Sequence, residues 1–256
     1  MEILKTTGIA LSSQALGEAD IICNFYTRDC GKRRFLFKGL KKSKKRSLAA
    51  TEPGSMSTLV YYQRDDRDYC IVNEITVEKY YTAITADLNK IWHLYFLLES
   101  VDKTSGFDMG DESIFKLLSA GIEVLSKTEF PAHLSAFMIL HLLQLHGILS
   151  DLDFCKLCGT KQFSTFAMDV TDLRPVCGAC LGAASSGHWR GSTVLPGAMR
   201  EYMVLCMSQK FNAIDHGRFS EKDLLDLLFA ISLFMEHYFH MEIKSKSFIF
   251  SDRLNR

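Results

Sequence analysis

Two closely spaced cysteine pairs constrain this 256-residue chain more than any other feature of its sequence. Cys155 and Cys158 form one Cys-x2-Cys pair, Cys177 and Cys180 form a second, and 18 residues separate the two pairs. The short turn inside each pair lets two thiolates face a point about 2.3 Å away, so two pairs supply a tetrahedron of sulfur. This spacing lies within the range of zinc ribbons and predicts a four-thiolate zinc site. Four protein ligands leave no position for water, so we expect the zinc to be structural and to stabilise a segment too small for its own core.

Other interpretations of the cysteines are weaker. Two disulfides need an oxidising compartment, which nothing else in the sequence indicates. A redox motif needs one active pair, whereas this chain has two matched pairs. An iron–sulfur cluster also takes tetrahedral sulfur ligands, but the ribbon spacing favours zinc. The remaining four cysteines are scattered, as is typical of a reducing, cytoplasmic protein: Cys23, Cys30, Cys70 and Cys206.

The apolar segments are too short or too polar to span a bilayer. The longest, 134–145 and 224–239, fall short of about 20 residues and contain His, Gln, Asp or Glu. The first residues, 1–5, have no basic region followed by a long apolar run, so no signal peptide is predicted. We therefore expect a cytoplasmic protein with no membrane partner.

Residues 1–80 show the alternating pattern and the turn residues of short β-strands. Phe35 and Phe37 share one face of the third of these strands, so we expect both in the core. Five short strands in about 80 residues indicate a small closed barrel or a sandwich. The predicted strands are 3–12, 20–27, 31–38, 57–62 and 69–77.

From residue 81 onward the apolar pattern becomes helical. Residues 220–223, Ser-Glu-Lys-Asp, resemble a capping box at the start of the last long helix. Residues 150–192 interrupt the helical pattern and hold both cysteine pairs, so we expect a zinc-binding insertion there. The predicted helices are 86–102, 111–127, 131–147, one that opens at Pro196, and 220–239.

A formal net charge of zero conceals a strongly basic segment. Residues 28–48 carry ten Lys or Arg and one Asp, a local charge of +9 that the other 235 residues balance. Phosphates of a nucleic acid are the obvious counter-charge beside a small β-barrel, whereas the alternative is a merely solvated loop. The nine candidate binding residues fall within 15 positions: Lys32, Arg33, Arg34, Lys38, Lys41, Lys42, Lys44, Lys45 and Arg46.

The sequence has no catalytic constellation, and no catalytic residue is predicted. P-loop, G-x-S-x-G and G-x-G-x-x-G motifs do not occur. His133, His141 and His146 lie outside any H-E-x-x-H frame and are expected to be core or interface residues. The acidic segment 65–68 is expected to be a polar hairpin tip rather than a cation site.

The order of several motifs resembles that of the bacterial recombination mediator family RecO. The cysteine pairs stand where many members carry a zinc motif, and Ile243-Lys244-Ser245-Lys246-Ser247-Phe248 is similar to the family's closing Leu-Lys-Ser-Arg motif. Lys246 keeps the positive charge of that arginine but loses its bidentate fork. The N-terminal motifs are Gly17-Glu18-Ala19-Asp20, Phe25-Tyr26-Thr27-Arg28, Gly31-Lys32 and Lys38-Gly39 before a basic loop.

The resemblance implies an α+β multidomain fold. Its parts would be an N-terminal five-stranded OB-fold barrel at 1–80 that binds DNA and an α-helical domain at 81–256. A four-cysteine zinc ribbon would be inserted into the helical domain at 150–192.

The resemblance also implies a protein without enzymatic activity that acts in the cytoplasm at the nucleoid. Members of the family bind single- and double-stranded DNA and anneal complementary strands in the RecFOR pathway of recombinational repair. They act with RecR to load RecA onto strands coated by the single-stranded-DNA-binding protein SSB. The acidic C-terminal tail of SSB docks on the helical domain.

Three hypotheses for the function follow. The first is a DNA-binding mediator, and the second is an adaptor that binds the acidic SSB tail without a functional DNA contact. The third is a zinc enzyme such as a deaminase, which needs an open zinc position and the pattern H-x-E followed by P-C-x-x-C. Val176 stands where that proline would be, and no H-x-E precedes the pair, so the sequence disfavours the third.

Overall fold

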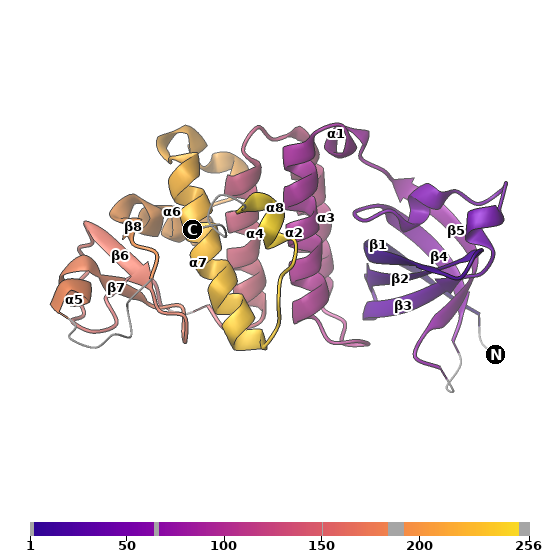
Figure 1. The fold of residues 1–256 in the computed structure, drawn as a ribbon, viewed down its shortest axis with the longest axis horizontal. Coiled ribbons are helices and arrows are strands. Elements are labelled where there is room, and N and C mark those ends of the chain that lie inside the picture. Colours follow the sequence, from indigo (N-terminus) through magenta and orange to yellow (C-terminus); the bar gives the residue numbers. More distant parts are fainter. Residues whose placement is uncertain (1–2, 64–66, 150, 184–191, 251–256) are drawn as a thin grey trace. The chain divides into compact units, whose positions relative to one another are not determined.

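The computed structural model describes residues 3–63, 67–149, 151–183 and 192–250 (Figure 1). The chain forms two compact units, Met1–Thr128 and Glu129–Arg256. The first unit combines the β-rich segment with two of the helices expected in the helical domain. The functional division at residue 80 stays a prediction.

The β-rich segment is a closed five-stranded barrel with the strand order β1-β2-β3-β5-β4, which confirms the OB-fold (Figure 1). Neighbouring strands are antiparallel except β3 and β5, which are parallel. The register of β1 shifts between Ala10 and Ser12, a bulge that bends this long strand around the barrel. The strands are β1 (Ile3–Leu16), β2 (Asp20–Thr27), β3 (Gly31–Phe37), β4 (Met56–Tyr62) and β5 (Cys70–Lys79).

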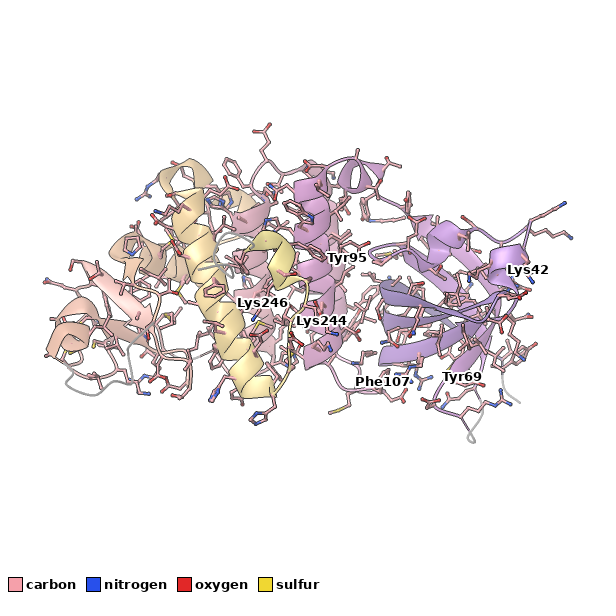
Figure 2. All side chains as sticks on the ribbon, in the orientation of Figure 1. Lys42, Tyr69, Tyr95, Phe107, Lys244 and Lys246 are labelled. Atoms are coloured by element: carbon pink, nitrogen blue, oxygen red, sulfur yellow. The ribbon has the colours of Figure 1, made fainter. Side chains whose placement is uncertain are left out.

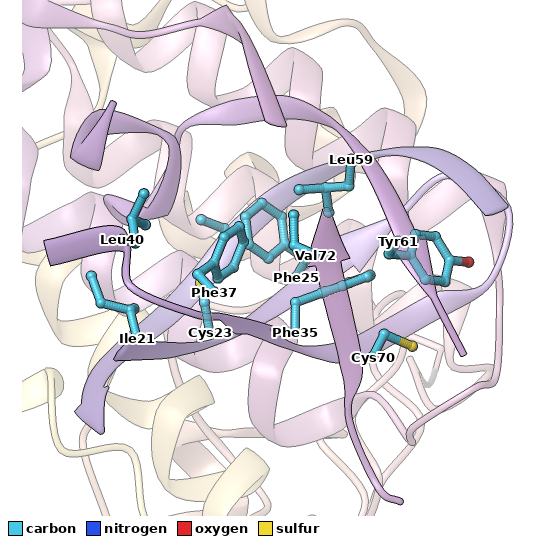
Figure 3. Packing of buried hydrophobic residues seen from close by; sticks show 11 residues of the cluster. Ile21, Cys23, Phe25, Phe35, Phe37, Leu40, Leu59, Tyr61, Cys70 and Val72 are labelled. Carbon is cyan, nitrogen blue, oxygen red and sulfur yellow. The ribbon is translucent and has the colours of Figure 1, made fainter. Parts of the chain in front are cut away.

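Aromatic side chains fill the barrel (Figure 3). Phe25, Phe35 and Phe37 have no exposed surface. The rings of Phe25 and Phe35 meet edge to face with centroids 5.6 Å apart, a favoured arrangement for buried aromatics. Phe35 and Phe37 are therefore core residues, as predicted, and their rings are closed to a ligand.

Short helices and two long ones complete the first unit. Asp87 and Asp111 cap the long helices, because each carboxylate accepts hydrogen bonds from free backbone N–H groups of the first turn. The elements are the 3-10 turns η1 (Leu40–Lys42) and η2 (Leu48–Thr51), and the helices α1 (Thr82–Thr85), α2 (Leu88–Thr104) and α3 (Glu112–Lys127).

The second unit combines a helical bundle with a small three-stranded sheet of order β7-β6-β8. The predicted insertion at 150–192 contains β6, β7 and α5, and its residues 150 and 184–191 lie outside the described ranges. The elements are α4 (Pro131–Leu145), β6 (Thr165–Met168), β7 (Pro175–Cys177), α5 (Gly178–Ala183), β8 (Leu195–Pro196), α6 (Gly197–Ser208), η4 (Phe211–Ala213), η5 (His216–Arg218), α7 (Glu221–Phe239) and α8 (Lys246–Ile249).

One sequence prediction for α7, its capping box, is wrong, whereas the closing motif contacts this helix. Ser220 is the residue before α7, but its side chain makes no capping hydrogen bond, so the predicted capping box is wrong. Lys246 of the closing motif lies 2.5 Å from a carboxylate oxygen of Glu236, and each side chain is 16% exposed. The other carboxylate oxygen of Glu236 accepts from the Ile243 N–H at 2.9 Å. The lysine thus fastens the C-terminal segment to α7.

Across the described ranges, no helix is both long enough and apolar enough to cross a membrane. The predicted hairpin between β4 and β5 is present, although residues 64–66 of its acidic tip lie outside those ranges.

A buried histidine should make the stability of the first unit depend on pH. His93 in α2 is 1% exposed, and burial lowers its pKa from 6.5 to about 4. Below pH 6.5 the unfolded chain binds a proton at this histidine, whereas the native state binds it only near pH 4. The free energy of unfolding is therefore at its full value above pH 6.5. It falls by about 3 kcal/mol as the pH is lowered to 4. We expect His93→Gln to unfold in urea with a weaker pH dependence between 6.5 and 4, followed by circular dichroism. Parallel curves for both proteins would contradict this.

Candidate functional site

The four paired cysteines come together in the second unit. Their sulfur atoms lie within 4.8 Å of one another, and all four thiols are free. A tetrahedral zinc site with bonds of about 2.3 Å has sulfur atoms roughly 3.8 Å apart. The sulfur atoms of Cys158 and Cys177 are 3.7 Å apart, so the cluster fits a metal ion of this size.

The backbone builds each half of the cluster locally. Gly159 has φ +71°, and its N–H donates to the carbonyl of Cys155 at 2.9 Å, which closes the first turn. The N–H of Lys156 donates to the carbonyl of Pro175 at 2.8 Å, which joins this turn to β7 and hence to Cys177. Ion pairs of Lys156 with Asp169 and Asp172 hold the same turn to the segment after β6. These backbone contacts thus bring the four cysteines that the sequence spacing singled out to one point.

The thiols respond differently to this environment. Burial opposes ionisation of Cys155, but the backbone N–H groups of Cys177, Cys158 and Leu157 lower the pKa of its thiol to about 6. Hydrogen bonds with Cys158 and Cys177 raise the pKa of Cys180 to about 12. A bound divalent cation supplies the charge that four adjacent thiolates require.

The basic strand β3 is neutralised inside the first unit. Lys32 is 8% exposed, and its ammonium lies 3.3 Å from a carboxylate oxygen of Asp102 and donates to the Asp102 carbonyl. The guanidinium of Arg33 lies 2.6 Å from Asp108 and donates to the hydroxyl of Tyr61 at 3.2 Å. Lys32 therefore holds the last turn of α2 against the barrel, and Arg33 holds the segment that follows this helix.

Arg34, the third cation of β3, is also paired. Its guanidinium lies 2.8 Å from Asp68, and its carbon atom lies 5.1 Å from the centroid of the Phe107 ring. Its side chain keeps 35% of its surface exposed, so it remains open to a ligand. The strand residues are positioned by carboxylates rather than free.

The loop after β3 presents its cations to solvent. Leu40 is fully buried in the barrel core, and the Ser43 hydroxyl accepts from the N–H groups of Lys45 and Arg46. The pair of Lys42 and Glu18 at 3.1 Å is largely exposed and therefore weak. Among described residues, the remaining loop lysines form no ion pair with a carboxylate: Lys38, Lys41, Lys44 and Lys45. Arg46 is half-buried, and its guanidinium donates to the Lys38 carbonyl.

The structure thus divides the predicted set. Three of its nine cations belong to β3 and hold the fold, whereas Lys38 and the residues after it form a loop, which we call the lysine loop (residues 38–46). Sequence reasoning missed Asp102, Phe107 and Asp108, because their contacts with β3 span about 70 residues of chain and leave no local pattern.

The fold and the cysteine cluster define a two-unit protein with an OB-fold barrel, an exposed lysine loop and a helical unit that carries a four-cysteine ribbon. The family model for Recombination protein O N terminal matches residues 1–81, and that for Recombination protein O C terminal matches residues 85–247. The chain belongs to the RecO family of DNA repair and recombination proteins.

Curated relatives named DNA repair protein RecO align over most of the chain. The protein of Syntrophus aciditrophicus is 23% identical over 245 residues, 94% of this chain and 93% of the relative. The protein of Caldanaerobacter subterraneus is 23% identical over 252 residues, 97% and 98% of the two chains. The protein of Leptospira biflexa is 26% identical over 184 residues, 70% of this chain and 73% of the relative.

The division of the cations predicts two kinds of variant. Lys32→Met should lower the free energy of unfolding of the first unit by about 2 kcal/mol, because it leaves the Asp102 carboxylate, 17% exposed, without its cation. Lys45→Met in the exposed loop should change it by less than about 0.5 kcal/mol. Urea unfolding measures both values. Equal losses of stability from the two substitutions would contradict the division of the basic segment into structural cations on β3 and exposed cations in the loop.

Proposed function

We propose that this protein is a DNA-binding mediator of recombinational repair that binds single- and double-stranded DNA through the lysine loop. The observation that carries the proposal is the exposure of five lysines on an OB-fold barrel, next to strand cations that carboxylates already occupy. Binding of phosphates to such exposed ammonium groups releases counterions from the DNA, and this supplies affinity without base specificity.

Annealing of complementary strands follows from the same surface. Two DNA strands repel each other through their phosphates, and a cationic loop that contacts both lowers this repulsion. Contacts with phosphates position the strands but do not read their sequence, so annealing by this route is independent of sequence.

The cysteine cluster supports a structural zinc site in this proposal. Cys155, Cys158, Cys177 and Cys180 would be the four ligands, and their thiolates would fill the coordination sphere. A closed sphere leaves no position for substrate or water, so the zinc would stabilise the ribbon rather than catalyse a reaction. The likeness to the RecO relatives supports a protein without enzymatic activity.

The likeness to the RecO relatives supports further partners. We propose RecR and the acidic C-terminal tail of SSB as protein partners, loading of RecA onto SSB-coated strands as the outcome, and the cytoplasmic nucleoid as the location. The second candidate function, an adaptor for the acidic tail alone, is favoured by the same lysine loop, because carboxylates are also counter-charges for ammonium groups.

Salt-dependent DNA binding tests the proposal. If about four phosphates of a fluorescent single-stranded oligonucleotide are neutralised, the logarithm of affinity should fall against the logarithm of salt with a slope near about −3. Replacement of Lys41, Lys42, Lys44 and Lys45 by Ala should flatten this slope and slow annealing in the same samples. The control carries Lys103→Ala and Lys116→Ala on the helices and should keep the slope.

The same variants separate the two candidate functions. Loss of DNA binding with unchanged binding of an acidic SSB-tail peptide places the functions on different surfaces and supports the mediator. If the variant loses only peptide binding and keeps the salt dependence of DNA binding, the adaptor hypothesis is correct.

Metal analysis tests the zinc site. The purified protein should contain about one zinc per chain, and Cys155→Ser with Cys177→Ser should lose it. A strong chelator should release the metal and lower the thermal stability of the second unit, with the barrel unchanged. Cys206→Ser, at a buried cysteine outside the cluster, serves as the control and should retain zinc. Iron in place of zinc, or no metal in the wild-type protein, would contradict the proposal.

A further inference from the structure

A small pocket opens on the first unit, away from the lysine loop. Its volume is about 190 Å³, and it lies between β3, the start of β5 and the segment after α2. Tyr69 and Phe107 line it, and Figure 2 shows these two residues on the same side of the barrel and Lys42 of the lysine loop on another part. Two of the predicted DNA-binding residues, Arg33 and Arg34, line this pocket, but the sequence analysis did not indicate its aromatic residues.

The segment that supplies Phe107 is built onto β3. The N–H of Asp108 donates to the carbonyl of Lys32 at 2.9 Å, and Phe107 pairs with Lys32 as an isolated β-bridge. Gly31 has φ +68°, and a Cβ at this position would lie 2.2 Å from the carbonyl oxygen of Met109. Only glycine permits this close approach, so the position of Phe107 is set by backbone packing.

Two aromatic rings line the pocket together with cations. Phe107 is 43% exposed although the Lys32 ammonium lies 4.4 Å from its ring centroid. Tyr69 accepts a hydrogen bond from Arg67 at 2.7 Å, and the guanidinium carbon of Arg67 lies 5.4 Å from the Tyr69 ring. An exposed aromatic face beside guanidinium groups is the composition of a stacking platform for bases of a single strand.

The charges of the pocket discriminate between a phosphate and a base. Arg33 pairs with Asp108, whose side chain is 64% exposed. Arg34 pairs with Asp68, whose side chain is 74% exposed. Three guanidinium groups and two carboxylates line the pocket, so the carboxylates offset most of the attraction that the arginines would exert on a phosphate. The edge of a nucleobase carries donors and acceptors side by side, so guanidinium N–H groups and carboxylate oxygens can both bind it.

We propose that this pocket takes one unstacked nucleobase of single-stranded DNA, stacked on Phe107, and so makes the protein prefer single strands to duplex. The inference rests on the proposed DNA binding and adds a base-dependent contribution to the phosphate contacts of the lysine loop. A base in a duplex enters only after unpairing and unstacking, which costs a few kcal/mol. The preference therefore needs no recognition of sequence.

Arg34 connects this pocket to the rest of the barrel surface. It also lines a wider groove of about 620 Å³ that runs past Asn24 and Gln14 to Leu16. The next residue, Gly17, accepts a hydrogen bond from Lys41 of the lysine loop at 3.3 Å. This groove, lined by both polar and apolar side chains, leads from the pocket toward the loop that would hold the phosphates of the strand.

The test compares three fluorescent probes at one salt concentration: a single-stranded 20-mer, an abasic 20-mer with the same phosphates, and a 20-base-pair duplex. The wild-type protein should bind the single strand about tenfold more tightly than the abasic strand, the factor expected for one stacked base. Phe107→Leu keeps an apolar side chain but removes the π face, and it should reduce the difference to less than about twofold with unchanged abasic binding. Tyr95→Leu, at an aromatic residue of α2 that is 40% exposed, is the matched control and should keep the difference.

A second measurement needs no variant. Irradiation of the wild-type protein with an oligonucleotide that contains 5-iodouracil should crosslink a peptide with Phe107 or Tyr69. Crosslinks confined to the lysine loop would overturn the inference, as would equal binding of the single and abasic strands.

The outcomes also separate this inference from the proposed function. Absence of binding to all three probes at low salt refutes the DNA-binding function and, with it, the proposed binding of a base in the pocket. Salt-dependent binding with equal affinity for the single strand and the abasic strand refutes only the proposed binding of a base in the pocket.

Discussion

The pairing of β3 with one carboxylate at the end of α2 and one in the segment after it is the interaction on which the first unit depends. Three consecutive cations on a barrel strand would be costly to bury without partners. Asp102 and Asp108 neutralise Lys32 and Arg33, and each carboxylate comes from about 70 residues further along the chain. Because these contacts cross from the barrel to the helices, α2 and the barrel form one compact unit.

This neutralisation also decides which cations remain for a ligand. The β3 side chains point to fixed partners, whereas the lysine loop is held by Leu40 and Ser43 and leaves its ammonium groups in solvent. One continuous basic segment thus contains strand cations that stabilise the fold and loop cations that remain exposed. The same pairing places Phe107 beside Arg34, so the structural contacts also form the pocket proposed to take a base.

The second unit relies on polar and thiol contacts where its apolar core is thin. The ribbon strands β6, β7 and β8 contain four residues or fewer, which is too short for an independent core. The four sulfurs converge beside a small cluster of buried side chains, and a bound metal would add the stability that so short a sheet lacks. At the end of the chain, the pair of Lys246 and Glu236 has the corresponding effect, because it holds a short C-terminal segment on α7.

The sequence by itself determined the features that local patterns encode. The spacing of Cys155, Cys158, Cys177 and Cys180 predicted their convergence, because each pair closes a tight turn of its own. Alternation along β3 placed Phe35 and Phe37 in the core, and the ordered motifs indicated the family. The capping box at Ser220 was wrong, because residue type at a helix start does not fix the direction of a hydroxyl.

Only the tertiary structure decided which charges are free. In the sequence Lys32 and Lys44 are equivalent members of one basic segment, but the first lies against Asp102 and the second faces solvent. The pairing of Phe107 with Lys32 is likewise set by chain closure over a long separation, and no residue pattern near either position records it. Charge neutralisation depends on distances in space, and these arise only when the barrel and the helices have packed.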